Sequence, residues 1–178
     1  MLILSLILIA VGVAADQAVK FLVVENLRPD GVLTAIPGLL DFVYVENTGA
    51  AFGMFGDYTW ILSVVTAVLV VVVLFCLLFY RNHSFFSRTA GILIVAGGIG
   101  NLIDRIRLEY VIDYIRVSFF PPVFNLADCF VVVGVILFFI HILFFMDRDH
   151  GRERIIRTRR RASWKRGHSV SPLNRRLP

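Results

Sequence analysis

Four long apolar stretches separate the polar segments of the 178-residue chain. They cover about residues 2–21, 58–80, 89–103 and 125–146, and the third is short and rich in glycine. A helix that crosses a bilayer core of about 30 Å needs roughly 20 mostly apolar residues. The pattern therefore predicts an all-α membrane core of four transmembrane helices.

The first stretch has an alternative interpretation, a secretory signal peptide. Such a signal begins with basic residues and ends at a cleavage site of small residues. No Lys or Arg precedes this apolar run, and Asp16 lies inside it. We therefore expect a retained helix.

The two connections expected outside the membrane, 22–57 and 104–124, carry extended patterns. Apolar and β-branched residues at 32–36 and 39–45 flank Pro37-Gly38, which predicts two strands around a turn. Residues 110–117 are also rich in β-branched and aromatic types. We expect a small extracytoplasmic β-sheet resting on the four helices.

Composition supports the membrane assignment. Hydrophobic residues make up 58% of the chain and charged residues 17%, whereas soluble domains have about 45–50% and about 25%. The net charge of +5 comes from residues 147–178, which hold 11 Lys and Arg against 3 Asp and Glu. The excess of basic residues therefore lies in a short tail and does not indicate nucleic-acid binding.

The same charges predict the orientation. Lys and Arg accumulate on the cytoplasmic side of membrane proteins, so the tail and, with four spans, the N-terminus are expected in the cytoplasm. We predict a membrane domain at 1–148 and a disordered Arg-rich cytoplasmic tail at 149–178, which at most contacts anionic lipid headgroups.

This topology brings polar side chains from every part of the chain to one depth, near the external membrane face. They are Asp16, Asn47, Asn101, Asp104, Arg105, Asp113, Asn125 and Asp128. Ionisable residues in such apolar surroundings need partners or a function.

Several of these residues also have a purely structural interpretation. Asp104 is followed by Arg105 and can form an ion pair with it, and Asp16 can bond a neighbouring helix. The asparagines can join helices by hydrogen bonds, or they can shape a site. The glycines at 97, 98 and 100 favour close helix packing. The histidines are isolated, so no metal site is expected.

Asp113 and Asp128 have no adjacent cation in the sequence. The chain between them contains Pro121-Pro122, so it can turn and bring the two carboxyls face to face. Two adjacent carboxyls share a proton, and one can then act as base toward water while the other protonates the leaving group. This is the chemistry of an aspartic protease. A proton-coupled transporter and a non-enzymatic scaffold remain the alternatives.

Five sequence blocks in order resemble the lipoprotein signal peptidases, the signal peptidase II family. The resemblance covers about residues 10–146. The blocks are Asp16-Gln17 with Lys20, Asn47-Thr48-Gly49-Ala50-Ala51-Phe52-Gly53, Gly100-Asn101-Leu102-Ile103-Asp104-Arg105, Val111-Ile112-Asp113-Tyr114 and Phe124-Asn125-Leu126-Ala127-Asp128.

The resemblance implies a four-span aspartic endopeptidase of the bacterial inner membrane, with a β-sheet cradle and without metal or other cofactor. Separately from the resemblance, we expect a monomer. It implies cleavage of lipid-modified prolipoproteins just before the diacylglyceryl cysteine. It also implies that Asp113 and Asp128 are catalytic. The residues implied to bind substrate or shape the site are Asp16, Lys20, Asn47, Gly49, Asn101, Arg105 and Asn125.

Overall fold

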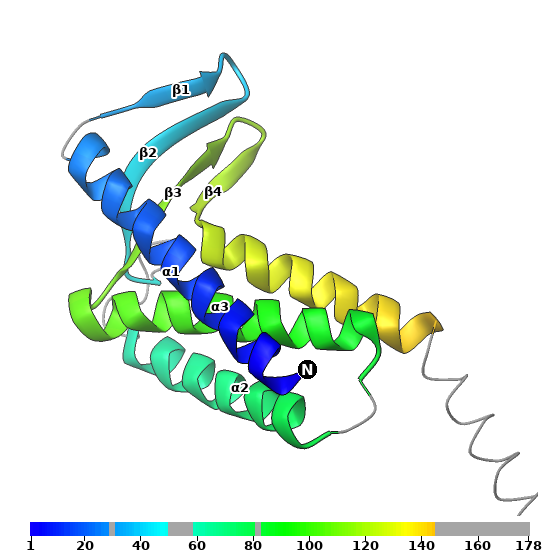
Figure 1. The fold of residues 1–178 in the computed structure, drawn as a ribbon. Coiled ribbons are helices and arrows are strands. Elements are labelled where there is room, and N and C mark those ends of the chain that lie inside the picture. Colours follow the sequence, from blue (N-terminus) through cyan, green and yellow to red (C-terminus); the bar gives the residue numbers. More distant parts are fainter. Residues whose placement is uncertain (29–30, 50–58, 81–82, 145–178) are drawn as a thin grey trace, which may run out of the picture. The chain divides into compact units, whose positions relative to one another are not determined.

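The computed structural model describes residues 1–28, 31–49, 59–80 and 83–144. Four of its helices are long and apolar enough to cross a membrane, and four strands form one antiparallel sheet (Figure 1). In chain order the elements are α1 (Leu2–Leu27), β1 (Leu33–Ile36), β2 (Leu40–Asn47), α2 (Thr59–Phe79), α3 (Phe85–Leu108), β3 (Val111–Val117), β4 (Phe120–Phe124) and a fourth helix, Leu126–Phe144. The predicted fold class is confirmed.

The chain divides into two units, Met1–Phe139 and Ile140–Pro178. The fold described below is that of the first unit. The predicted domain boundary at 148 and the Arg-rich tail at 149–178 lie outside the described residues.

Helix α3 is the central helix of the first unit. Half of its most apolar window is buried, against 11–17% in the other three spans. Small residues permit this packing: a Cβ on Gly97 would lie 2.3 Å from the Ala127 carbonyl oxygen, and one on Gly98 would lie 2.4 Å from a Val70 methyl. The expected packing role of these glycines is therefore seen against the fourth helix and α2.

Two helices are longer than the sequence predicted. We expected spans at 2–21 and 89–103, but α1 continues to Leu27 and α3 runs from Phe85 to Leu108. Charged residues near its ends limited the predicted apolar stretch of α3, but the helix itself continues past them. It begins at Ser84, whose side chain accepts the Ser87 N–H, and ends at Glu109 in the left-handed conformation.

The sheet has the strand order β1-β2-β3-β4. The predicted strands at 32–36, 39–45 and 110–117 correspond to β1, β2 and β3, with shifts of one or two residues at their ends. The strand β4 was not predicted, because it contains Pro121-Pro122. Proline is tolerated there since β4 pairs with β3 alone and forms an edge of the sheet.

Strand β4 leads directly into the fourth helix. At the end of β4, Phe124 pairs with Ile115 of β3, and the fourth helix begins two residues later at Leu126. The sheet therefore sets where the fourth helix starts, next to the residues of β3 that precede Ile115.

Candidate active site

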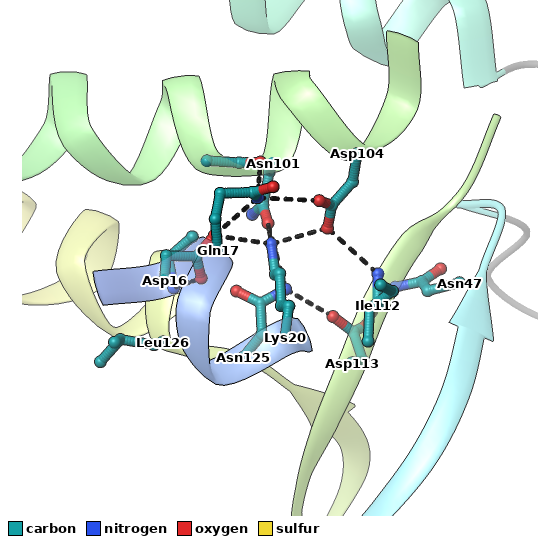
Figure 2. A network of polar contacts seen from close by, with 12 residues as sticks. Asp16, Gln17, Lys20, Asn47, Asn101, Asp104, Ile112, Asp113, Asn125 and Leu126 are labelled. Carbon is teal, nitrogen blue, oxygen red and sulfur yellow. Dashed lines mark hydrogen bonds and ion pairs between the residues drawn. The ribbon is translucent and has the colours of Figure 1, made fainter. Parts of the chain in front are cut away.

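A buried lysine on α1 lies at the centre of a polar network between α1 and α3 (Figure 2). The Lys20 ammonium is 2.9 Å from an Asp16 carboxylate oxygen and 2.7 Å from one of Asp104. It also donates to the Asn101 side-chain oxygen at 2.9 Å. Lys20 is only 2% exposed, so all three of its donors are satisfied inside the protein.

The structural interpretation of Asp104 offered Arg105 as its ion-pair partner, but the structure gives it another. Asp104 pairs with Lys20 instead, because neighbouring residues on a helix point in different directions and do not face each other. The second Asp104 oxygen accepts a hydrogen bond from the Gln17 amide at 2.9 Å. Asp104 also accepts the backbone N–H of Ile112 at 3.3 Å, so it joins α3 to β3.

Asp16 joins α1 to the start of the fourth helix. Besides its ion pair with Lys20, it accepts the backbone N–H of Ala127 at 3.0 Å. The side chain is completely buried. A Cβ on Gly100 would lie 2.6 Å from one of its oxygens, so the glycine leaves the space that Asp16 occupies against α3.

The fourth helix begins with a reciprocal pair of hydrogen bonds between Asn125 and Asp128. The Asn125 side-chain oxygen accepts the Asp128 N–H at 2.9 Å, and an Asp128 carboxylate oxygen accepts the Asn125 N–H at 3.2 Å. This is the geometry of a capping box, with Asn at the cap and Asp three residues later. Asp128 therefore lies at the helix N-terminus for a local reason.

Asp113 is held by two amides. Its carboxylate accepts hydrogen bonds from Asn47 at 2.7 Å and from Asn125 at 2.6 Å. The sheet register explains the first bond: Asn47 pairs with Val111, and Val45 pairs with Asp113. Asn47 is thus a diagonal neighbour of Asp113 on the same face of the sheet.

Asn125 therefore contacts both carboxyls that the sequence singled out. Its side-chain amide reaches Asp113, and its backbone N–H reaches Asp128. Asn101 completes the chain of contacts, since its amide donates to Asp128 at 2.7 Å and its oxygen accepts from Asn125 at 3.1 Å.

The orientation of these amides is determined by their other partners. The Asn101 oxygen faces Lys20, which can only donate, so the Asn101 NH₂ must face Asp128. The Asn47 oxygen accepts the N–H of Gly49 at 2.8 Å, so the Asn47 NH₂ must face Asp113. Gly49 adopts φ +81°, a conformation that favours glycine.

The electrostatics of Asp113 follow from its burial. Burial raises the pKa of the Asp113 carboxyl to about 6, and the nearby Asp128 charge acts in the same direction. The hydrogen bonds from Asn47 and Asn125 and the charge of Lys20 oppose that rise. Asp113 therefore changes its charge near neutral pH, which is a useful property for a group that transfers protons.

A pocket of about 250 Å³ opens beside Asp128, between α2, α3 and the fourth helix. Asn101, Arg105 and Asp128 line its polar end, and the rest of its wall is mainly apolar. Leu69 and Val132 line it and are 49% and 57% exposed. Arg105 lies near enough to interact with the charges of Asp128 and Asp113.

The structure thus brings Asp16, Lys20, Asn47, Asn101, Asp113, Asn125 and Asp128 into a connected set of contacts, with Gly49 and Arg105 beside it. Residues 50–53 of the second sequence block lie outside the described residues.

Sequence reasoning missed the bridging role of Gln17 and the Asn125–Asp128 capping box. An Asn followed three residues later by Asp, just before an apolar run, was the signal for the latter.

Comparison with known proteins agrees with this architecture. Residues 8–144 match the family model described as signal peptidase (SPase) II. A lipoprotein signal peptidase from Caldanaerobacter subterraneus is 41% identical over 134 residues, which is 75% of this chain and 92% of the relative. One from Streptococcus pyogenes is 39% identical over 150 residues, or 84% of this chain and 95% of the relative.

Solved structures are similar as well. A bacterial membrane enzyme determined by the in meso method at 1.9 Å resolution aligns with a TM-score of 0.73 and 26% identity, over 80% of this chain and 94% of that one. Another, at 2.3 Å, aligns with a TM-score of 0.70 and 27% identity, over 78% and 87%. With this likeness and a family match over most of its length, the chain belongs to the signal peptidase II family and is a membrane peptidase.

Proposed function

We propose that this protein is an aspartic endopeptidase that removes the signal peptide from bacterial prolipoproteins by cutting before a diacylglyceryl-modified cysteine. The relatives that it matches are named lipoprotein signal peptidases. The observation that carries the aspartic mechanism is the sharing of Asn125 by Asp113 and Asp128. One residue holds both carboxyls, although they come from a strand and from a helix.

In the proposed reaction, the two carboxyls hold one proton between them. The ionised carboxyl takes a proton from a water molecule as that water attacks the carbonyl carbon of the scissile peptide bond. The protonated carboxyl gives its proton to the departing amine nitrogen. Burial raises the pKa of Asp113 to about 6, so the singly protonated pair is populated at a higher pH than for an exposed carboxyl.

The surrounding residues serve this pair. Asn47, Asn101 and Asn125 each donate an N–H to a carboxylate oxygen, and Gly49 orients Asn47. The Arg105 guanidinium provides a positive charge beside the pair.

Two further residues hold the elements that carry the carboxyls. Asp16 fixes the backbone of the fourth helix, and Lys20 connects Asp16 with Asn101. A misplacement of about 1 Å in such a site can reduce a rate by about 100-fold. These contacts therefore support the reaction rate by fixing the positions of the two carboxyls.

The substrate is proposed to reach the site from the bilayer. The pocket beside Asp128 has mainly apolar walls, and Leu69 and Val132 at its edge are exposed on surfaces that belong to spanning helices. A lipid-modified cysteine and an apolar signal segment partition into the same membrane. Anchoring both partners there makes the encounter effectively intramolecular. The proposed orientation has both termini in the cytoplasm and the site near the external face of the inner membrane, and we expect a monomer.

The test compares two forms of one prolipoprotein precursor, with and without the diacylglyceryl group, using purified protein in lipid bilayers. We expect cleavage of the lipidated form and a kcat/KM lower by about 100-fold or more for the unmodified form, since the lipid supplies the positioning. Equal cleavage of both forms would contradict the lipid-dependent part of the proposal. No cleavage of either form would contradict the whole.

A second prediction concerns stability and pH. The pKa of Asp113 is about 6 in the folded protein and 3.8 as the reference for an exposed carboxyl. The folded state therefore binds this proton more tightly than the unfolded state, and ionising Asp113 costs about 2–3 kcal/mol of stability above pH 6. Below about pH 4 both states are protonated and the cost disappears.

We therefore expect wild type to gain stability relative to Asp113→Asn as the pH falls from 7.5 through 6 toward 4, because only wild type binds this proton more tightly on folding. Asn47 and Asn125 both donate to Asp113, so the variant places its NH₂ group against one of these donors at every pH, and this cost does not depend on pH. Thermal unfolding of both proteins in detergent micelles across this range measures the difference. A difference in unfolding temperature that does not change with pH would contradict the burial argument.

A further inference from the structure

Tyr114 directly follows Asp113 on β3, and its hydroxyl reaches the start of the fourth helix. The hydroxyl oxygen accepts the backbone N–H of Leu126 at 3.1 Å. The side chain is 3% exposed, and its ring packs in a core cluster with Val23 and Ile112. Burial raises the pKa of the Tyr114 hydroxyl, so the group is neutral at physiological pH.

The start of the fourth helix shows why this bond matters. The first N–H groups of a helix have no partner within it. Here the N–H of Leu126 binds Tyr114, that of Ala127 binds Asp16, and that of Asp128 binds the Asn125 side chain. The first two partners belong to other elements, β3 and α1. They hold the helix backbone from outside.

Tyr114 connects the two elements that carry the proposed catalytic carboxyls. It lies one residue after Asp113, and its partner Leu126 lies two residues before Asp128. The Asn125 side chain also connects β3 with the helix start, but that amide is itself one of the groups that contact Asp113. A bond to the Leu126 backbone instead holds the helix while leaving the Asn125 amide in place for Asp113 and Asn101.

We infer that Tyr114 is a positioning residue: its hydroxyl holds the start of the fourth helix against β3 and so sets the separation of Asp113 and Asp128. The inference rests on the proposed aspartic mechanism. It assigns Tyr114 no contact with substrate or with the reacting atoms. Its effect passes through the backbone of Leu126.

The first test is Tyr114→Phe, which keeps the ring and removes the hydroxyl. We expect kcat for the lipidated precursor to fall by about tenfold or more, because small displacements of reacting groups are costly, while KM changes by less than about twofold. The matched control is Tyr110→Phe. It also removes a hydroxyl contact, the 3.1 Å bond to Tyr44, but touches neither carboxyl. Its kcat should stay within about twofold of wild type.

A second variant distinguishes two roles of the Tyr114 hydroxyl: positioning the helix, and providing a hydrogen-bond partner for the buried N–H of Leu126. Proline lacks an N–H and is tolerated at the first helical position, so adding Leu126→Pro to Tyr114→Phe removes the unpaired donor. Leu126 also packs against the Tyr114 cluster, so Leu126→Pro alone is the reference for the double variant. We expect Tyr114→Phe to lower the unfolding temperature less in the Leu126→Pro background than in wild type, because no donor is left unpaired there, while kcat stays low. Recovery of kcat together with stability would overturn the inference, because the hydroxyl would then matter only for folding.

The remaining outcomes are also decisive. A Tyr114→Phe variant with the same kcat as Tyr110→Phe would overturn the inference and leave the proposed function standing, provided that wild type cleaves the lipidated precursor. A wild-type protein that cleaves no lipidated precursor would overturn the proposed function, and the positioning role would fall with it.

Discussion

Replacing Asp113 or Asp128 by asparagine is expected to reduce cleavage of a lipidated prolipoprotein by about 10²–10⁴-fold, the usual contribution of a general acid or base. Asparagine has nearly the size of aspartate but cannot exchange a proton at neutral pH. Each variant thus removes either the acid or the base from the pair while the surrounding amides remain. The measurement is kcat/KM for the purified variants in lipid bilayers.

The control for this experiment is Asp41→Asn, a change of the same kind on β2. Asp41 is paired with Arg116 at 2.9 Å and bonds Thr34 at 2.8 Å, at the exposed side of the sheet. Its pKa is lowered, first by the hydrogen bond from Arg116, so it is ionised at neutral pH and has no proton to transfer. This variant should keep wild-type activity. Substantial turnover by Asp113→Asn or Asp128→Asn would remove the assignment of the pair.

Replacing Lys20 by methionine is expected to cause the largest loss of stability. The substitution keeps the length of the side chain but leaves Asp16 and Asp104 buried together without a cation. Breaking a buried ion pair by removing one partner costs about 3–5 kcal/mol. It also releases the Asn101 oxygen from the donor that orients it. The unfolding temperature in micelles and the amount of folded protein measure the effect.

A compensating change tests the cause. Adding Asp104→Asn to Lys20→Met removes one of the two uncompensated carboxylates and should restore part of the lost stability. The contrasting change is Arg116→Met, which breaks a surface pair whose arginine is 46% exposed. Exposed pairs contribute little, so this variant should unfold near the wild-type temperature. If Lys20→Met behaved like Arg116→Met, the central network would not be essential for folding.

Much of the architecture was predictable from local patterns. The four spans follow from apolar runs that water cannot solvate, and their number was right although two of them extend further than expected. Alternating β-branched residues around Pro37-Gly38 predicted the hairpin of β1 and β2. The two prolines of β4 obscured that strand, because whether proline is tolerated depends on its place at the sheet edge.

The partners within the candidate site were harder to predict than its members. The sequence blocks named Asp16, Lys20 and Asn101, but the adjacent pair Asp104 and Arg105 suggested the wrong ion pair. Helix geometry turns Asp104 toward Lys20, 84 positions earlier in the chain. Contacts of this kind depend on which faces of α1 and α3 meet, and hydropathy carries no information on that choice.

By itself, the sequence determined that this chain crosses a membrane four times and holds a small set of polar residues that hydrocarbon would not tolerate without partners. It also carries, in order, the blocks shared with the signal peptidase II family. Only the tertiary structure decided that Asn125 contacts both Asp113 and Asp128, and that Tyr114 holds the helix that carries Asp128. The physical reason is that a hydrogen bond requires its two groups to lie within about 3 Å. Such distances arise from strand register and helix packing over the whole chain.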